Sequence, residues 1–199
     1  MIQSDVVDLA KALRTFFSAS SHAYIQETLL LWPETDAVSA TLPASSSLPV
    51  LSFLDVASQN APADSKPLAD AVKNAAPALC WGQTYSKSDL GDAFLNRYGW
   101  TSVVGPNAPI KNQHLISGFL FLGPDIEYPY HKHSVEEVYK VVSGTASWRL
   151  GEDDWTPLPP GSVVHNTPWR AHGMRTNHGE PLLLAFLWRS GAVEKSVMV

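Results

Sequence analysis

Apolar residues recur at helical spacing in the first half of the chain. The first predicted helix follows a Ser-Asp cap at residues 4–5, and its apolar positions are Val6, Leu9, Leu13, Phe16 and Phe17. Further helices are predicted over residues 24–31, around residue 54, over residues 67–76 and over residues 86–98. Residues 39–49, rich in Ser, Ala, Thr and Pro, are predicted to form a loop.

From residue 102 onward the pattern changes to short strand-like runs. These cover residues 115–122, 135–142, 147–150, 162–165 and 182–188, with Gly and Pro turns between them. Such regular spacing predicts a mainly β fold, a double-stranded β-helix barrel with an N-terminal α-helical extension. We place the extension at residues 1–100 and the barrel at residues 101–199. We expect one structural domain, because the leader helices carry too many apolar positions to stand alone.

Four polar side chains share odd numbers in one strand-like run: His131, His133, Glu137 and Tyr139. Because successive side chains of a strand alternate between its faces, all four are expected on the same side. Imidazole and carboxylate are common ligands of zinc, iron, nickel and manganese. The run therefore predicts half of a metal site.

A further ligand is expected from residues 161–172, where Pro168 forms a stiff corner before His172. We favour His172 over His165, because a histidine at the end of a strand more often satisfies a local hydrogen bond. The chain has a single cysteine, Cys80, so neither a thiolate zinc cage nor an internal disulfide can form.

These residues resemble the cupin superfamily, and more closely the cupin-type dimethylsulfoniopropionate (DMSP) lyases. The motif of that group has the form YxxHxHxxxExY followed by GxxxxxxPxxxH. Its tyrosine two residues after the glutamate separates the group from other cupins. The matching residues are Tyr128, His131, His133, Glu137, Tyr139, Gly161, Pro168 and His172.

The resemblance implies a metal-dependent carbon–sulfur lyase that cleaves DMSP, a small zwitterion, to dimethyl sulfide and acrylate. The four predicted ligands would hold one divalent transition metal per chain: zinc, iron, manganese, nickel or cobalt. Elimination needs a base, and Tyr139 is the first candidate, because a nearby cation lowers the pKa of a phenol from about 10. Tyr128, at the expected pocket mouth, is a rival.

Aromatic faces attract a sulfonium cation through cation–π interaction. Trp169, Trp188 and Phe186 are therefore candidate substrate walls. Tyr130 is a further candidate, although its even number turns it away if the strand already runs there.

The sequence is also compatible with two other classes of protein. One is another metal-dependent cupin enzyme, such as a non-heme dioxygenase or an isomerase, and the other is a non-catalytic cupin that binds a small ligand.

The composition of the chain limits the kinds of binding partner and the location that we expect. The 199 residues are 45% hydrophobic and 17% charged, a balance that leaves room for a subunit interface such as that of a homodimer. The net charge of −5 disfavours nucleic acid. No apolar stretch approaches the roughly 20 residues of a membrane span, and the first residues lack the pattern of a secretion signal. A cytoplasmic location is expected.

Overall fold

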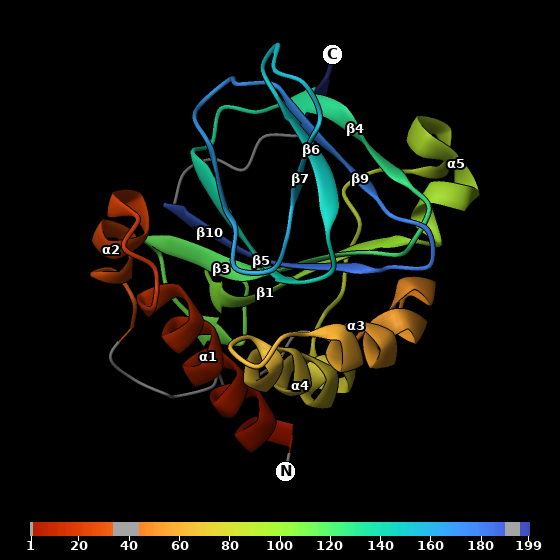
Figure 1. Ribbon diagram of the computed structural model, residues 1–199. Helices are drawn as coiled ribbons and strands as arrows, with labels where there is room; N and C mark the ends of the chain where they lie inside the picture. Colours follow the sequence, from red (N-terminus) through yellow and green to blue (C-terminus); the bar gives the residue numbers. More distant parts are fainter. Residues whose placement is uncertain (1, 34–43, 190–195) are drawn as a thin grey trace.

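The computed structural model describes residues 2–33, 44–189 and 196–199, and in them two β-sheets face each other above a layer of helices (Figure 1). One sheet has six strands in the order β2-β1-β3-β10-β5-β8, and the other has five in the order β11-β4-β9-β6-β7. The strands of the six-stranded sheet are β1 Tyr98–Gly105, β2 Ile110–Lys111, β3 Leu115–Leu122, β5 Glu137–Ser143, β8 Val163–Asn166 and β10 Leu182–Arg189. The strands of the five-stranded sheet are β4 Glu127–Lys132, β6 Ala146–Leu150, β7 Thr156–Leu158, β9 His172–Thr176 and β11 Val197–Met198.

The helices all precede the first strand. They are α1 Ile2–Ser18, α2 Ala23–Leu29, α3 Leu54–Asn60, α4 Lys66–Ala75 and α5 Lys87–Leu95, with short 3-10 turns at Pro49–Phe53 and Ala76–Ala78. The predicted loop at residues 39–49 lies partly outside the described residues.

Two helix ends differ from the sequence prediction by three residues or more. The first helix begins at Ile2, so Ser4 and Asp5 lie in its first turn and do not cap it from outside. The last helix ends at Leu95, because the chain turns into β1 at Tyr98. Its start is fixed by Ser86, which forms a reciprocal capping box with Asp89.

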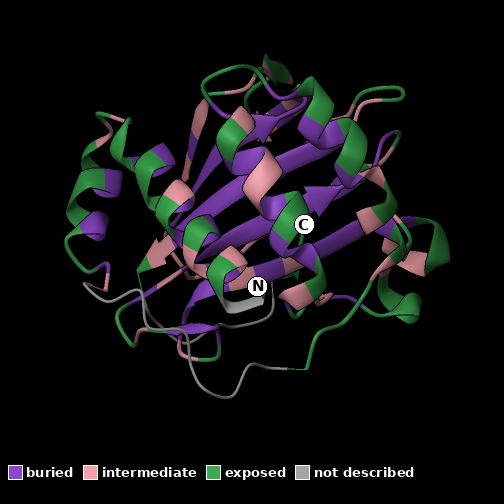
Figure 2. Ribbon diagram, turned by 90° about the horizontal axis from the view of Figure 1, so that it is seen from below, coloured by how far each residue is buried: buried purple, intermediate pink, exposed green. Residues whose placement is uncertain are grey.

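The six-stranded sheet is buried on both faces. On β3, Phe119 and Phe121 pack into the cluster that contains the leader helices, whereas Leu120 and Leu122 point into the barrel. Figure 2 shows the helices with exposed outer sides lying across a buried sheet. This double burial explains why β3 has a continuous apolar run instead of an alternating one. The predicted boundary at residue 101 falls inside β1.

The structure corrects the interpretation of the histidine-rich run as one strand. His131 lies in β4, whereas Glu137 and Tyr139 lie in β5, and these two strands belong to opposite sheets. Residues 133–136 form the bend that carries the chain from one sheet to the other. The side chains still converge, because the inner faces of the two sheets look toward each other.

Candidate metal centre and cavity

Three histidines meet at one end of the barrel interior. His131 and His172 are paired neighbours on the antiparallel strands β4 and β9, and His133 follows the end of β4. One ring nitrogen from each histidine lies within 4.8 Å of the other two, and all three residues are buried. The structure therefore brings together the three histidines that the sequence singled out.

Backbone carbonyls fix the orientation of each ring. An Nδ1–H that donates to a carbonyl leaves the Nε2 lone pair free for a ligand. The Nε2 atom of His172 is buried and has no hydrogen-bond partner in the described part of the chain. The three Nδ1 contacts are His131 to Pro129 O at 2.7 Å, His133 to Val135 O at 2.8 Å and His172 to Arg170 O at 2.9 Å.

Burial keeps two of the rings neutral. It lowers the pKa of His131 to about 3 and also lowers the pKa of His172. For His133, burial acts in the same direction, but the hydrogen bond and charge of Glu137 outweigh it and raise the pKa. Glu137 stays ionised because His133 and His172 lower its pKa against the effect of its own burial.

The Glu137 carboxylate lies beside the histidines and completes the group. Its Oε2 atom is 3.4 Å from His133 Nε2 and 3.8 Å from His172 Nε2. The indole of Trp188 donates to Oε1 at 2.6 Å, and the side-chain amide of Asn166 donates to Oε2 at 3.0 Å. The carboxylate is thus held on both sides.

This donor set fits a divalent transition metal. Three imidazoles and one carboxylate suit zinc, iron, nickel, cobalt or manganese, and they suit calcium and magnesium poorly. The buried, unpartnered Nε2 atom of His172 supports the fit, because such an atom is costly unless something binds it.

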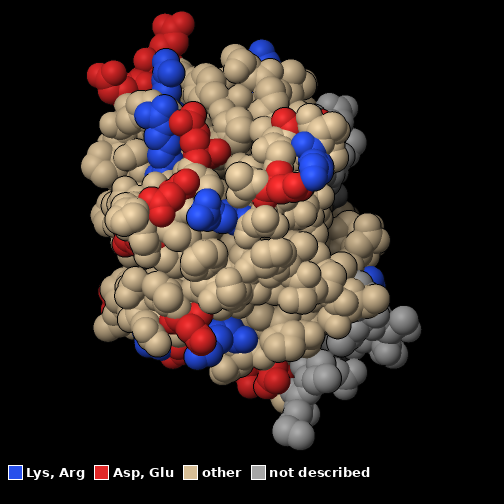
Figure 3. Space-filling model, turned by 90° about the vertical axis from the view of Figure 1, so that its right-hand side faces the viewer, with Lys and Arg blue, Asp and Glu red and all other residues tan. Residues whose placement is uncertain are grey.

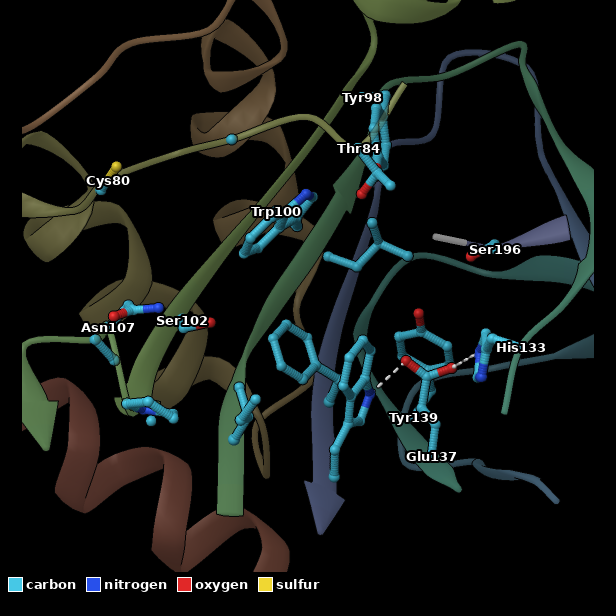
Figure 4. Close-up of a pocket in the computed structure, with 18 of the residues that line it drawn as sticks. Cys80, Thr84, Tyr98, Trp100, Ser102, Asn107, His133, Glu137, Tyr139 and Ser196 are labelled. Carbon is cyan, nitrogen blue, oxygen red and sulfur yellow. Dashed lines mark hydrogen bonds and ion pairs between the residues drawn. The ribbon is translucent and has the colours of Figure 1, made fainter. Parts of the chain in front are cut away.

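A cavity of 530 Å³ opens from this centre, a volume within the usual range for small-molecule sites. Figure 4 shows Glu137, His133 and Tyr139 at one end and Cys80 and Asn107 toward the other. No Lys or Arg is among the described residues that line it. Besides His131, His133 and Glu137, its lining includes Cys80, Thr84, Tyr98, Trp100, Ser102, Asn107, Ile116, Leu120, Tyr128, Tyr139, Phe186 and Trp188.

The two candidate bases, Tyr139 and Tyr128, both line the cavity. Burial, the charge of Glu137 and its hydrogen bond with the phenol raise the pKa of Tyr139 well above 10. Burial also raises the pKa of Tyr128, whose hydroxyl donates to Tyr85 at 3.3 Å. A register shift between Tyr128 and His131 lets both face the interior despite their unequal parity.

Two of the predicted substrate walls lie elsewhere. The hydroxyl of Tyr130 donates to the carbonyl of Gly151, so this side chain is directed away from the cavity. Trp169 is 54% exposed and lies outside the lining. Tyr130 and Trp169 are therefore not among the lining residues of this cavity, whereas Phe186 and Trp188 line it.

Sequence reasoning missed other residues of this site. Tyr98, Trp100 and Ser102 line the cavity from β1, and their shared even parity is a signal that could have been found. Thr84 comes from the leader, and Asn166 reaches Glu137 from β8. Neither has a local sequence signal, because each contact joins distant parts of the chain.

Fold and site together define a cupin-like β-barrel with a three-histidine centre. A cupin-2 domain from Rhodospirillum rubrum superposes with a TM-score of 0.50 at 14% identity, covering 62% of this chain and 76% of that one. The family model described as dimethylsulfoniopropionate lyase matches residues 29–184. This chain belongs to that family.

Individual relatives agree with this assignment. A structure published as one of the DMSP lyases RdDddP and RnDddQII superposes with a TM-score of 0.88 at 30% identity, covering 100% of both chains. The DddL protein of Cereibacter sphaeroides is 34% identical over 126 residues, which are 63% of this chain and 51% of DddL. The chain matches between 51% and 59% of the length of its first two curated relatives.

Proposed function

We propose that this protein is a metal-dependent DMSP lyase that releases dimethyl sulfide and acrylate by β-elimination. The observation that carries the proposal is the buried centre of three histidines and Glu137, which shares one aromatic cavity with Tyr139 in a chain of the DMSP lyase family. Residues His131, His133, Glu137 and His172 are the proposed ligands of one divalent transition metal.

The cavity suits the sulfonium end of the substrate. The ring centroids of Phe186 and Trp188 lie 5.5 Å apart, and both residues line the cavity, as does Trp100. Aromatic faces attract a cation, and the absence of Lys or Arg from the described lining leaves no positive side chain to repel it.

The carboxylate end of the substrate has no cationic side chain to bind among the described lining residues. His131, His133, Glu137 and His172 would hold a divalent cation, which would supply positive charge for this carboxylate and for the enolate charge that develops on it. His131 and His172 serve this purpose by remaining neutral.

Tyr139 is the proposed base that removes the α-proton. Burial and Glu137 raise its pKa well above 10, so its hydroxyl is protonated and hydrogen-bonded to Glu137. A cation held by the histidines would favour the phenolate of Tyr139 and so lower this pKa. Tyr128 is the second candidate, but its hydroxyl already donates to Tyr85.

The surface of the molecule bears on its possible partners. No helix among the described residues has the length and apolar character needed to cross a bilayer. On the face shown in Figure 3, acidic and basic side chains lie in small mixed groups. We propose a small zwitterionic substrate and no nucleic-acid partner, and we predict a homodimer and a cytoplasmic location.

The test is headspace gas chromatography for dimethyl sulfide. Purified protein is stripped of metal, reloaded in turn with zinc, iron(II), manganese, nickel and cobalt, and mixed with DMSP. Metal-dependent release that EDTA abolishes is the expected result, and it ranks the metals. Absence of release from folded protein shown to carry metal would overturn the proposal, and an oxygen-uptake screen for other cupin reactions would follow.

A further inference from the structure

The Glu137 carboxylate is held by its two cross-strand neighbours. Glu137 on β5 pairs with Asn166 on β8 and with Trp188 on β10, so one residue from each side lies next to it in the sheet. The Trp188 indole donates to Oε1 and the Asn166 amide donates to Oε2. Each carboxylate oxygen therefore receives one neutral N–H donor.

The two oxygens face different surroundings. Oε2, the atom that Asn166 binds, is also the atom that lies 3.4 Å from His133 Nε2 and 3.8 Å from His172 Nε2. The last torsion of a glutamate side chain is broad, so the carboxylate plane has no strong preference of its own. Asn166 on Oε2, together with Trp188 on Oε1 and the hydroxyl of Tyr139, thus sets how Oε2 is presented to the histidines.

Fold stability alone does not explain an asparagine at this position. Asn166 is 0% exposed, and its Oδ1 atom has no hydrogen-bond partner in the described part of the chain. A buried acceptor without a partner costs free energy, about 1–3 kcal/mol for a neutral group. An apolar residue at position 166 would avoid this cost but would leave Oε2 without its amide donor.

We propose that Asn166 is a positioning residue of the metal centre, which orients Glu137 so that Oε2 faces His133 and His172. The inference rests on the proposed metal centre and extends it to a residue outside the ligand set. Asn166 acts through Glu137 and has no contact with substrate in this role. Partners of this kind typically contribute a factor of about 10–100 to metal affinity.

The test compares two asparagines that make the same bond. Asn177 also donates its side-chain amide to a glutamate, Glu180, at 3.0 Å, but on an exposed turn outside the centre. Asn166→Leu and Asn177→Leu are therefore matched variants. Zinc affinity of the metal-free proteins is measured by competition with a chromogenic chelator, without DMSP present, and unfolding temperatures are recorded in parallel.

We expect zinc affinity to fall about 10- to 100-fold in Asn166→Leu and to stay within twofold of the wild type in Asn177→Leu. Wild-type zinc affinity in a folded Asn166→Leu protein would overturn the proposal, even if its unfolding temperature were lower. Asn166→Ala replaces Asn166→Leu if leucine prevents folding. Failure of both to fold in excess zinc would assign Asn166 to the fold and likewise overturn the proposal.

This experiment is independent of turnover. A wild-type protein that binds zinc but releases no dimethyl sulfide would refute the proposed lyase function and leave the affinity comparison valid. A wild-type lyase whose zinc affinity does not depend on residue 166 would refute only the role of Asn166.

Discussion

The hydroxyl of Tyr139 can be removed while all four proposed metal ligands stay in the chain, although it is hydrogen-bonded to one of them, Glu137. Tyr139→Phe should still bind zinc through the four proposed ligands and lower the rate of dimethyl sulfide release by about 10²- to 10⁴-fold, the usual contribution of a positioned base. Tyr130→Phe is the matched control, because that hydroxyl bonds Gly151 away from the cavity. Wild-type turnover in Tyr139→Phe would remove Tyr139 from the base role.

The histidines offer a similar comparison between neighbours. His172→Ala and His133→Ala should lose bound metal and lyase activity together, because each removes a ligand nitrogen from the triad. His165→Ala should retain both, since His165 pairs with Glu136 at the surface and lies outside the triad. Metal content by atomic emission and dimethyl sulfide release are measured on the same samples. A metal-free His165→Ala protein would contradict this assignment.

Among individual residues, the sequence predicted those site residues that lie within short motifs. His131, His133 and His172 come together as expected. Asn166 could not be found, because it meets Glu137 only through the pairing of β5 with β8. The exposure of Trp169 could not be predicted either, because spacing alone does not show which loop side chains turn outward.

Among the elements, β1 and β3 approach each other unusually closely at Gly118. A Cβ atom added at Gly118 would lie 2.0 Å from the carbonyl oxygen of Thr101 and 2.7 Å from Ser102 Cα. Backbone atoms cannot move aside as a flexible side chain can. Gly118→Ala should therefore lower the free energy of unfolding by about 2 kcal/mol or more, as measured by urea denaturation.

Gly82 provides the control for this strand contact. A Cβ atom at Gly82 would meet only the Trp100 ring, at 3.6 Å, which is an ordinary van der Waals distance. Gly82→Ala should thus leave the urea midpoint close to that of the wild type. Equal midpoints for both alanine variants would show that β1 can shift away from β3.

Strand bounds were predictable where burial is uniform and not where the chain changes sheets. The predicted strand at residues 115–122 coincides with β3, because its apolar run ends at turns on both sides. The boundary between β4 and β5 escaped prediction, because alternation of odd and even positions continues through the bend at residues 133–136. Parity reports which way side chains point and gives no information on which sheet holds them.

For the whole molecule, leader and barrel share one hydrophobic cluster. Leu13 of α1 is 0% exposed and belongs to the same cluster as Phe119 and Leu183 of the six-stranded sheet. Leu13→Ala should lower the free energy of unfolding by about 2–5 kcal/mol. Leu30→Ala, at a residue that is 84% exposed, should change it by less than about 0.5 kcal/mol.

Urea denaturation, which measures these changes in the free energy of unfolding, also tests whether the extension and the barrel unfold as one unit. Helix content by far-ultraviolet circular dichroism and barrel packing by near-ultraviolet circular dichroism should be lost in one coincident transition. Loss of helix before loss of near-ultraviolet signal would show that the extension folds and unfolds by itself.

The histidines lie on or next to strands of one sheet, whereas Glu137 lies on the other. An ion bound by all four would cross-link the two sheets, and by mass action it would stabilise only the folded chain. Free metal at 100 times its dissociation constant should add about 2.7 kcal/mol. Differential scanning calorimetry should therefore show a lower unfolding temperature in EDTA than in zinc, and identical values would contradict the cross-link. The amount of folded protein, and not its turnover alone, would then follow the metal supply.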